Sequence, residues 1–193
     1  MENFCNINGG LGLWAIFHIL ADLGFGRNGC VLTSLPKFRC TWKCVLMDAD
    51  QLAEACAEAM WKNDKASQTL GMSIDKISSG GAVLSMKVRA DMLNGQRICH
   101  GGYMFLLADS AFAFACNGYN QFTVAQSCKI DFLAPAFEGE VLQAVAKERY
   151  REGRSGIYDC TITNQDGKTI AEMRGNSRTV KGRHLPDIEE NVS

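Results

Sequence analysis

The 193-residue chain lacks an excess of charge of either sign, because 20 Lys and Arg residues stand against 21 Asp and Glu residues. Binding nucleic acid without sequence preference requires a broad basic surface. We therefore expect no nucleic-acid partner, while a local basic pocket for a small anion stays open. The apolar content of 47% and the charged content of 21% are those of an ordinary soluble protein. The length fits one domain with room for an extension.

Several catalytic motifs are also missing. The chain has no Gly-x-Ser-x-Gly elbow, no P-loop, no Gly-x-Gly-x-x-Gly after a strand and no His-Glu-x-x-His. Gly-Arg-Ser-Gly at 153–156 lies between two predicted strands, where its plain interpretation is a hairpin turn. No second Cys or His pair follows Cys40 and Cys44 at zinc-finger spacing, so we expect no metal site. The nine cysteines are an odd number without a convincing secretion signal, which favours reduced thiols in a cytoplasmic protein.

Residues 1–46 differ in composition from the rest of the chain. The apolar run 11–20 is shorter than the roughly 18 to 20 residues that cross a bilayer, and Glu2 stands where a signal peptide carries positive charge. We therefore expect a poorly ordered extension or a start codon assigned too early. A short helix that binds a membrane surface or a partner is the alternative. The main domain should span 47–181, and the tail 182–193 should be loose.

From residue 48 onward the sequence predicts a helix followed by strands. Leu52, Cys56 and Met60 recur every four residues, and Asp48 with Gln51 resembles a capping box. Strand-like runs occur at 72–77, 82–89, 123–133, 140–150, 157–164 and 168–180. Short hairpin connections leave no room for parallel crossovers, so the sheet should be antiparallel.

The run 103–117 has the length of a helix but no polar face, and such a helix should be buried all round. A sheet around one long buried helix is an α+β fold. Asp109 is the only charged residue between Gly102 and Gly118. Because burying a carboxylate costs several kcal/mol unless it is hydrogen-bonded or protonated, Asp109 is the main catalytic candidate. The alternative is a structural role, in which Asp109 and Ser110 accept hydrogen bonds from a neighbouring loop.

His100, Gly101 and Gly102 stand directly before this helix. Free amides at a helix start can stabilise negative charge that develops on a carbonyl oxygen, although a Gly-Gly pair by itself is more often a simple turn. Asp109 should lie about 10 Å along the axis from Gly102, at about 1.5 Å per residue. That is too far for both to hold one carbonyl from one helix. Either the substrate spans the gap or a second subunit contributes.

A basic cluster surrounds the predicted hairpin at 153–156. Its members are Lys147, Arg149, Arg151 and Arg154. Such a cluster can hold phosphate groups. The alternative is a solvated sheet edge, because two glutamates are interspersed among the basic residues.

Three segments resemble the hotdog thioesterases of the phenylacetate pathway, the hydroxyphenylacetyl-CoA thioesterases. They are 94–102 (Asn-Gly-Gln-Arg-Ile-Cys-His-Gly-Gly), 107–109 (Leu-Ala-Asp) and 127–133 (Ser-Cys-Lys-Ile-Asp-Phe-Leu). The resemblance covers roughly 48–180, and the residues before 47 have no counterpart in the family pattern. It implies a hotdog fold, in which an antiparallel sheet wraps the long helix. It also implies active sites at the interface of two subunits, usually within a dimer of dimers.

The resemblance further implies hydrolysis of an acyl-CoA thioester, of phenylacetyl or hydroxyphenylacetyl type, to the free acid and coenzyme A. Asp109 would act as base on water or as nucleophile, and the amide of Gly101, with or without Gly102, would hold the thioester oxygen. The thiol that leaves has a pKa of roughly 8 to 9, like that of cysteine, so no strong general acid is needed.

The remaining site residues follow from the same resemblance. Asn94 and Ser127 would position the water or the carboxylate, and His100 would orient the thioester or the loop. Coenzyme A would run along the subunit surface with its phosphates near Arg154, and Ser155 and Lys129 would also bind it. No separate cofactor is expected, because coenzyme A is part of the substrate.

Two other functions stay open. A hotdog protein that binds or senses acyl-CoA would keep the fold without turnover. A hotdog hydratase or dehydratase is the other alternative, although no His-Phe-Pro-type motif is present. The acyl group is also open, because the aromatic and methionine side chains of the long helix suit an apolar acid and core packing equally well.

Overall fold

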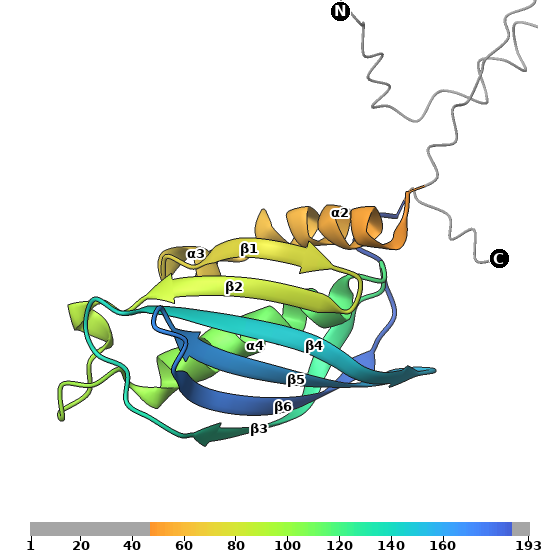
Figure 1. Ribbon diagram of the computed structural model, residues 1–193. Helices are drawn as coiled ribbons and strands as arrows, with labels where there is room; N and C mark the ends of the chain where they lie inside the picture. The colour runs from red at the N-terminus through yellow and green to blue at the C-terminus, as the bar shows by residue number, and fades with distance from the viewer. Residues whose placement is uncertain (1–46, 187–193) are drawn as a thin grey trace, which may run out of the picture. The chain divides into compact units, whose positions relative to one another are not determined.

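The computed structural model describes residues 47–186, in which six strands curl around one long helix (Figure 1). The helices are α2 (Ala49–Trp61), α3 (Lys65–Thr69) and α4 (Gly101–Asn117), with a short 3-10 helix η1 (Ala90–Met92). The strands are β1 (Ser73–Ser78), β2 (Gly81–Lys87), β3 (Thr123–Phe132), β4 (Val141–Glu152), β5 (Ser155–Asn164) and β6 (Thr169–Thr179). The predicted α+β hotdog architecture is confirmed.

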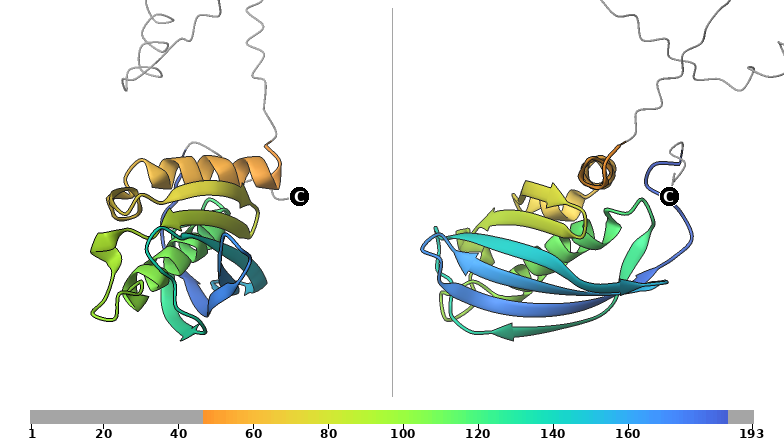
Figure 2. Two further views of the ribbon diagram at one scale, coloured as in Figure 1. Left: turned by 60° about the vertical axis from the view of Figure 1, so that its left-hand side comes forward. Right: turned by 45° about the vertical axis from the view of Figure 1, so that its right-hand side comes forward.

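The sheet has the order β1-β2-β4-β5-β6-β3, and all neighbouring strands are antiparallel. Glycines with positive φ lie in all three predicted hairpin turns, Gly80 at +70°, Gly153 at +55° and Gly167 at +77°. β1 and β3 are the edges of this sheet. The two further views in Figure 2 show that the strands cover α4 from one side, while α2 lies over β1.

The capping box that begins α2 is confirmed. The Gln51 amide donates to Asp48 Oδ1 at 2.8 Å, and the Asp48 amide donates to Gln51 Oε1 at 3.0 Å. The predicted face of α2 is confirmed in part, because Cys56 is buried whereas Leu52 and Met60 are only half-buried. The buried residues are the small side chains Ala53, Cys56 and Ala57. Small residues let α2 approach the C-terminal end of α4 closely.

The long helix α4 begins at Gly101, two residues earlier than the sequence predicts. Most of its C-terminal half is buried, as expected, although Ser110 and Ala113 are only half-buried. The N-terminal half is not, because Phe105, Leu106 and Asp109 are only half-buried and Gly102 is exposed. These four residues recur at helical spacing and form one stripe. The expectation of complete burial is therefore wrong for this stripe, since the sheet of one subunit does not cover it.

The first residues of the expected loose tail are held by hydrogen bonds. The Leu185 amide donates to Asn120 Oδ1 at 2.8 Å, and Asn120 Nδ2 donates back to the Leu185 carbonyl at 3.0 Å. His184 Nε2 lies 2.7 Å from Asn117 Oδ1 at the end of α4. Residues 182–186 thus continue the packed domain. The predictions for 1–46 and 187–193 lie outside the described residues.

Replacing Gly175 of β6 by alanine should destabilise the fold. A Cβ atom there would lie 2.9 Å from the ring of Phe112, which fills the core. We expect a loss of about 1–3 kcal/mol in the free energy of unfolding, measured by chemical denaturation. Gly95→Ala is the control, because its new Cβ would meet nothing within 4 Å. Equal stability of the two variants would contradict this account of the packing.

Candidate active site

The carboxylate of Asp109 lies half-buried in the open stripe of α4. Among residues 47–186, the only hydrogen-bond donor recorded for it is the thiol of Cys128, with Sγ 4.0 Å from Oδ1. Burial raises the pKa of Asp109. The neighbouring Ser110 instead bonds Ser67 at 2.9 Å between the two Oγ atoms. A purely structural role for Asp109, held by donors from a loop, is therefore not supported.

His100 forms the N-cap of α4 and uses one of the two predicted oxyanion amides. Its Nδ1 accepts a hydrogen bond from the Gly102 amide at 3.0 Å. A neutral imidazole that accepts at Nδ1 carries its proton on Nε2, which is then a donor. The Gly101 amide has no recorded acceptor within residues 47–186. Gly101, rather than Gly102, offers the free donor at the start of the helix.

Phe132 at the end of β3 lies against Gly101. A Cβ atom built on Gly101 would be 3.0 Å from Cζ of the Phe132 ring. A larger side chain at Gly101 would therefore have to displace the Phe132 ring. The C-terminal end of the edge strand β3 therefore lies beside the amide of Gly101.

Asn94 is held by its own loop. Its Oδ1 accepts from the Gln96 amide at 2.9 Å and from the Ile98 amide at 3.4 Å. The His100 amide donates to the Met92 carbonyl at 2.9 Å, which fixes the end of this loop to its beginning. Because its oxygen is engaged, Asn94 can offer only its Nδ2 group to a ligand, as a donor.

Ser127 and Cys128 lie on opposite faces of β3, and only the Cys128 thiol contacts Asp109. The Ser127 Oγ accepts from Asn176 Nδ2 on β6 at 3.0 Å. Cys128, the next residue, packs toward the core, and successive side chains of a strand point to opposite faces. One subunit therefore does not bring Ser127 and Asp109 together.

The predicted coenzyme A contacts also fall into two places. Lys129 pairs with Asp131 at 2.8 Å and is opposite Arg174 in the β3–β6 ladder. Ser155 is opposite Arg178, about 13 Å further along β6 at about 3.3 Å per residue. Arg154 precedes Ser155 and donates from Nε to the carbonyl of Thr179 at 3.0 Å. The structure thus does not join Lys129 with Arg154 and Ser155.

Most of the predicted basic cluster is already paired. Arg149 and Arg174 both contact Asp159 at 2.7 Å, and Arg174 first, then Arg149, hold the pKa of that carboxyl at about 2. Arg151 lies over the ring of Tyr119, 3.7 Å from its centroid. The cluster is therefore mainly part of the charged outer surface of the sheet.

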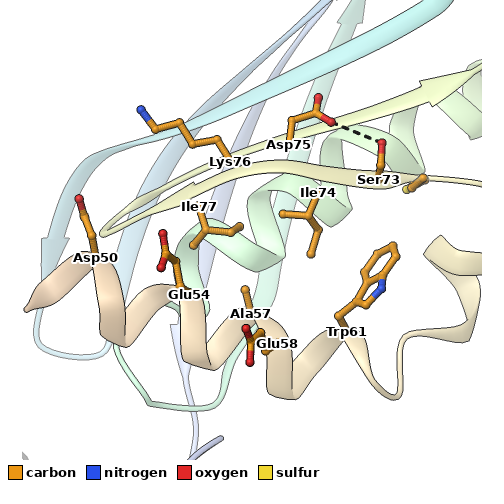
Figure 3. Close-up of a pocket in the computed structure, with 11 residues that line it drawn as sticks. Asp50, Glu54, Ala57, Glu58, Trp61, Ser73, Ile74, Asp75, Lys76 and Ile77 are labelled. Carbon is orange, nitrogen blue, oxygen red and sulfur yellow. Dashed lines mark hydrogen bonds between the residues drawn. The ribbon is translucent and has the colours of Figure 1, made fainter. Parts of the chain in front are cut away.

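The groove of about 690 Å³ shown in Figure 3 lies between α2 and β1, away from Asp109. Trp61, Ile74 and Ile77 line it, together with the acidic side chains Glu54 and Glu58. Within residues 47–186, no three His, Cys, Asp or Glu side chains meet as metal ligands. No helix in the same part of the chain is long and apolar enough to cross a membrane.

The comparison with known proteins assigns the family. The model of the thioesterase superfamily matches residues 96–171. Acyl-coenzyme A thioesterase PaaI of Escherichia coli K12 is 47% identical over 126 residues, which are 65% of this chain and 90% of that protein. This chain belongs to the thioesterase superfamily. It is a homologue of the PaaI-type enzymes, and the resemblance noted in the sequence is confirmed.

A solved structure of the same E. coli protein and one further relative agree with this assignment. The solved structure of E. coli PaaI, from the phenylacetic acid degradation operon, superposes with a TM-score of 0.70 and 44% identity. That match covers 70% of this chain and 99% of the other. A putative esterase of Archaeoglobus fulgidus is 34% identical over 142 residues, 74% of this chain and 90% of that protein.

Sequence reasoning missed three residues around the site of the thioesterase: Cys128, Phe132 and Asn176. The alternation of β3 contains a signal for the first, since Cys128 and Ile130 share the face that packs on the core. The contact between Phe132 and Gly101 depends on how β3 ends beside α4. The bond between Asn176 and Ser127 depends on the pairing of β3 with β6, which local sequence patterns do not specify.

Removing the His100 cap should weaken the thioesterase fold. His100→Ala leaves the Gly102 amide without its acceptor, and we expect a loss of about 1 kcal/mol in the free energy of unfolding. His100→Asn should keep most of the stability, because asparagine is a good N-cap. Denaturant unfolding measures both, with Asp48→Ala at the N-cap of α2 as a matched control. If His100→Asn is as unstable as His100→Ala, the cap does not explain the stability.

Proposed function

We propose that this thioesterase hydrolyses acyl-CoA thioesters of the phenylacetyl or hydroxyphenylacetyl type to the free acid and coenzyme A. The observation that carries the proposal is the half-buried Asp109, which within residues 47–186 has a single weak donor and lies on a helix whose first amide has no recorded acceptor. The chain is also 47% identical to an enzyme named acyl-coenzyme A thioesterase. The operon of the E. coli homologue, for phenylacetic acid degradation, supports the arylacetyl group.

In the proposed reaction, Asp109 takes a proton from water as the water oxygen attacks the thioester carbonyl carbon. The negative charge that develops on the carbonyl oxygen is held by the amide of Gly101. The carbon–sulfur bond then breaks, and coenzyme A leaves as a thiolate that takes up the proton from Asp109. The raised pKa of Asp109 makes it a stronger base than an ordinary aspartate.

Direct attack by the carboxylate is the second route to the same products. Asp109 would then form an anhydride with the acyl group as coenzyme A leaves, and water would cleave that anhydride. Both routes use the same carboxylate and the same amide. Neither needs a cofactor, and we propose none.

A second subunit completes the proposed site. Asp109 and Gly101 are about 12 Å apart along α4 at about 1.5 Å per residue, so they cannot hold one carbonyl from the same helix. The outer edge of β3 has no partner strand in residues 47–186. Val124, Phe132 and Leu133 on and after this strand are between 50% and 59% exposed. An unpaired, apolar edge favours pairing with a second copy.

Within such a dimer, the Gly101 turn of one subunit faces Asp109 of the other. Asn94 Nδ2 and His100 Nε2, from the subunit of the Gly101 turn, are donors that position the water or the thioester. Ser127 is contributed by the subunit that does not supply Asp109, because within one subunit these two residues lie apart. Arg154 and Ser155 contact the phosphates of coenzyme A, while Lys129 contacts a different part of the coenzyme A group of the substrate. The dimer of dimers and the cytoplasmic location stay predictions.

Asp109→Asn should abolish most of the turnover, because the amide can neither accept the proton nor attack. We expect kcat to fall at least about 100-fold in a thiol-release assay with phenylacetyl-CoA. Asp166→Asn, at the β5–β6 turn, is the matched control and should retain full activity. Undiminished turnover by Asp109→Asn would remove this residue from the mechanism. Binding of acyl-CoA by the wild type without thiol release would favour the non-catalytic alternative.

The pH dependence has a defined direction. Because burial raises the pKa of Asp109, the active carboxylate is lost at a higher pH than an ordinary aspartate of pKa about 3.9 would be. The acid limb of log kcat/KM should therefore lie above that value. An acid limb measured at or below a pH of about 3.9 would contradict the assignment of Asp109 as the catalytic carboxylate.

A charged side chain introduced on β3 should both separate the subunits and inactivate the enzyme. Val124 is 50% exposed on the unpaired edge strand, so Val124→Glu places a carboxylate in the proposed interface. Light scattering should show a smaller species with little thioesterase activity. Val141→Glu, at a 42% exposed position that begins β4, is the control. A fully active monomer would contradict the shared active site.

A further inference from the structure

Cys128 is the residue on β3 that faces the candidate catalytic carboxylate. Its side chain is half-buried and packs against the core. Sγ lies 4.0 Å from Oδ1 of Asp109, within reach of a hydrogen bond to sulfur, and it is the only donor recorded for this carboxylate in residues 47–186. Oδ2 has no recorded partner there and can face the substrate water.

We propose that the Cys128 thiol is a positioning residue, which orients the Asp109 carboxylate through an S–H···O hydrogen bond to Oδ1. This inference rests on the proposed function of Asp109 in thioester hydrolysis. Cys128 does not touch the reacting atoms. It fixes one carboxylate oxygen so that the other points out of the stripe of α4, toward the water.

The protonation state of Cys128 fits this task. Burial, and secondly the charge of Asp109, raise the pKa of its thiol, so it stays an S–H donor at neutral pH. The other thiol that interacts with Asp109 is that of Cys116 further along α4, whose pKa burial raises to about 12. The Cys116 thiol donates to the Ala113 carbonyl at 3.5 Å. Burial alone accounts for the raised pKa of Asp109, without a charged group from the strands or helices around α4.

A thiol suits this position better than a stronger donor. Charged or strong donors stabilise a carboxylate and lower its pKa, which makes it a weaker base. A thiol donates only weakly and otherwise behaves as a small apolar group that fills space. Cys128 can therefore orient Asp109 and keep it desolvated without removing its basicity.

The test compares variants that separate donor strength from volume. Cys128→Val removes the donor and keeps a side chain of similar size, Cys128→Ala removes both, and Cys128→Ser supplies a stronger donor. With phenylacetyl-CoA, we expect kcat of the valine and alanine variants to fall about three- to tenfold while KM stays unchanged. The acid limb of kcat/KM should move to higher pH in Cys128→Val, which keeps the volume and loses the donor, and to lower pH in Cys128→Ser.

Each other outcome has a defined meaning. Wild-type kcat and pH profile in Cys128→Val overturn the inference, as does a loss in all three variants that follows their thermal stability. Cys56→Ala, at a buried cysteine of α2, controls for thiol removal elsewhere and should keep the wild-type profile. Asp109→Asn, assayed in parallel, distinguishes a failure of the proposed function from a failure of the positioning role. If it stays active, the proposed function fails, and if only the Cys128 variants behave like wild type, the positioning role alone fails.

Discussion

The structure depends on the packing of a single sheet against one helix of 17 residues that carries almost no polar side chains. Burial of this helix against the sheet contributes apolar free energy to folding. A sheet that curls around a helix covers it from one side, and a stripe of α4 stays uncovered. Asp109 lies on that stripe, where the carboxylate is desolvated enough for its pKa to rise but is still accessible. The same packing that stabilises the fold therefore also sets the basicity of the site.

The uncovered stripe and the unpaired edge of β3 have one cause. Both lie at the end of the sheet order, where the strands of a single subunit stop. Phe132 connects them, since its ring lies on Gly101 while half of its surface is exposed. In the proposed dimer, pairing with a copy, rather than extended loops of the same subunit, would enclose the active site. That is consistent with a groove of about 690 Å³ that lies elsewhere, between α2 and β1.

Much of the fold could be predicted from the sequence, because local rules determine it. Period-two runs gave the six strands, and the absence of polar residues in 103–117 gave the central helix. The capping box of Asp48 is a local signal of the same kind. Tertiary contacts decided the rest. The buried face of α2 consists of Ala53, Cys56 and Ala57 because the approach to α4 favours small side chains over the larger Leu52 and Met60. The hydrogen bond between the Leu185 amide and Asn120 joins residues that are 65 positions apart, so a local sequence pattern does not predict it.

The site was predictable in its residue types but not in its hydrogen bonds. The sequence marks Asp109 and the Gly101–Gly102 pair, yet only the geometry shows that His100 takes the amide of Gly102, while that of Gly101 has no recorded acceptor in residues 47–186. This difference bears on the proposed chemistry. The bond from the Gly102 amide to His100 fixes the start of the helix, so in the proposed reaction the first amide would be presented in a fixed direction before substrate arrives. Such preorganised donors stabilise a developing oxyanion more than mobile ones do, because no reorganisation is needed during the reaction.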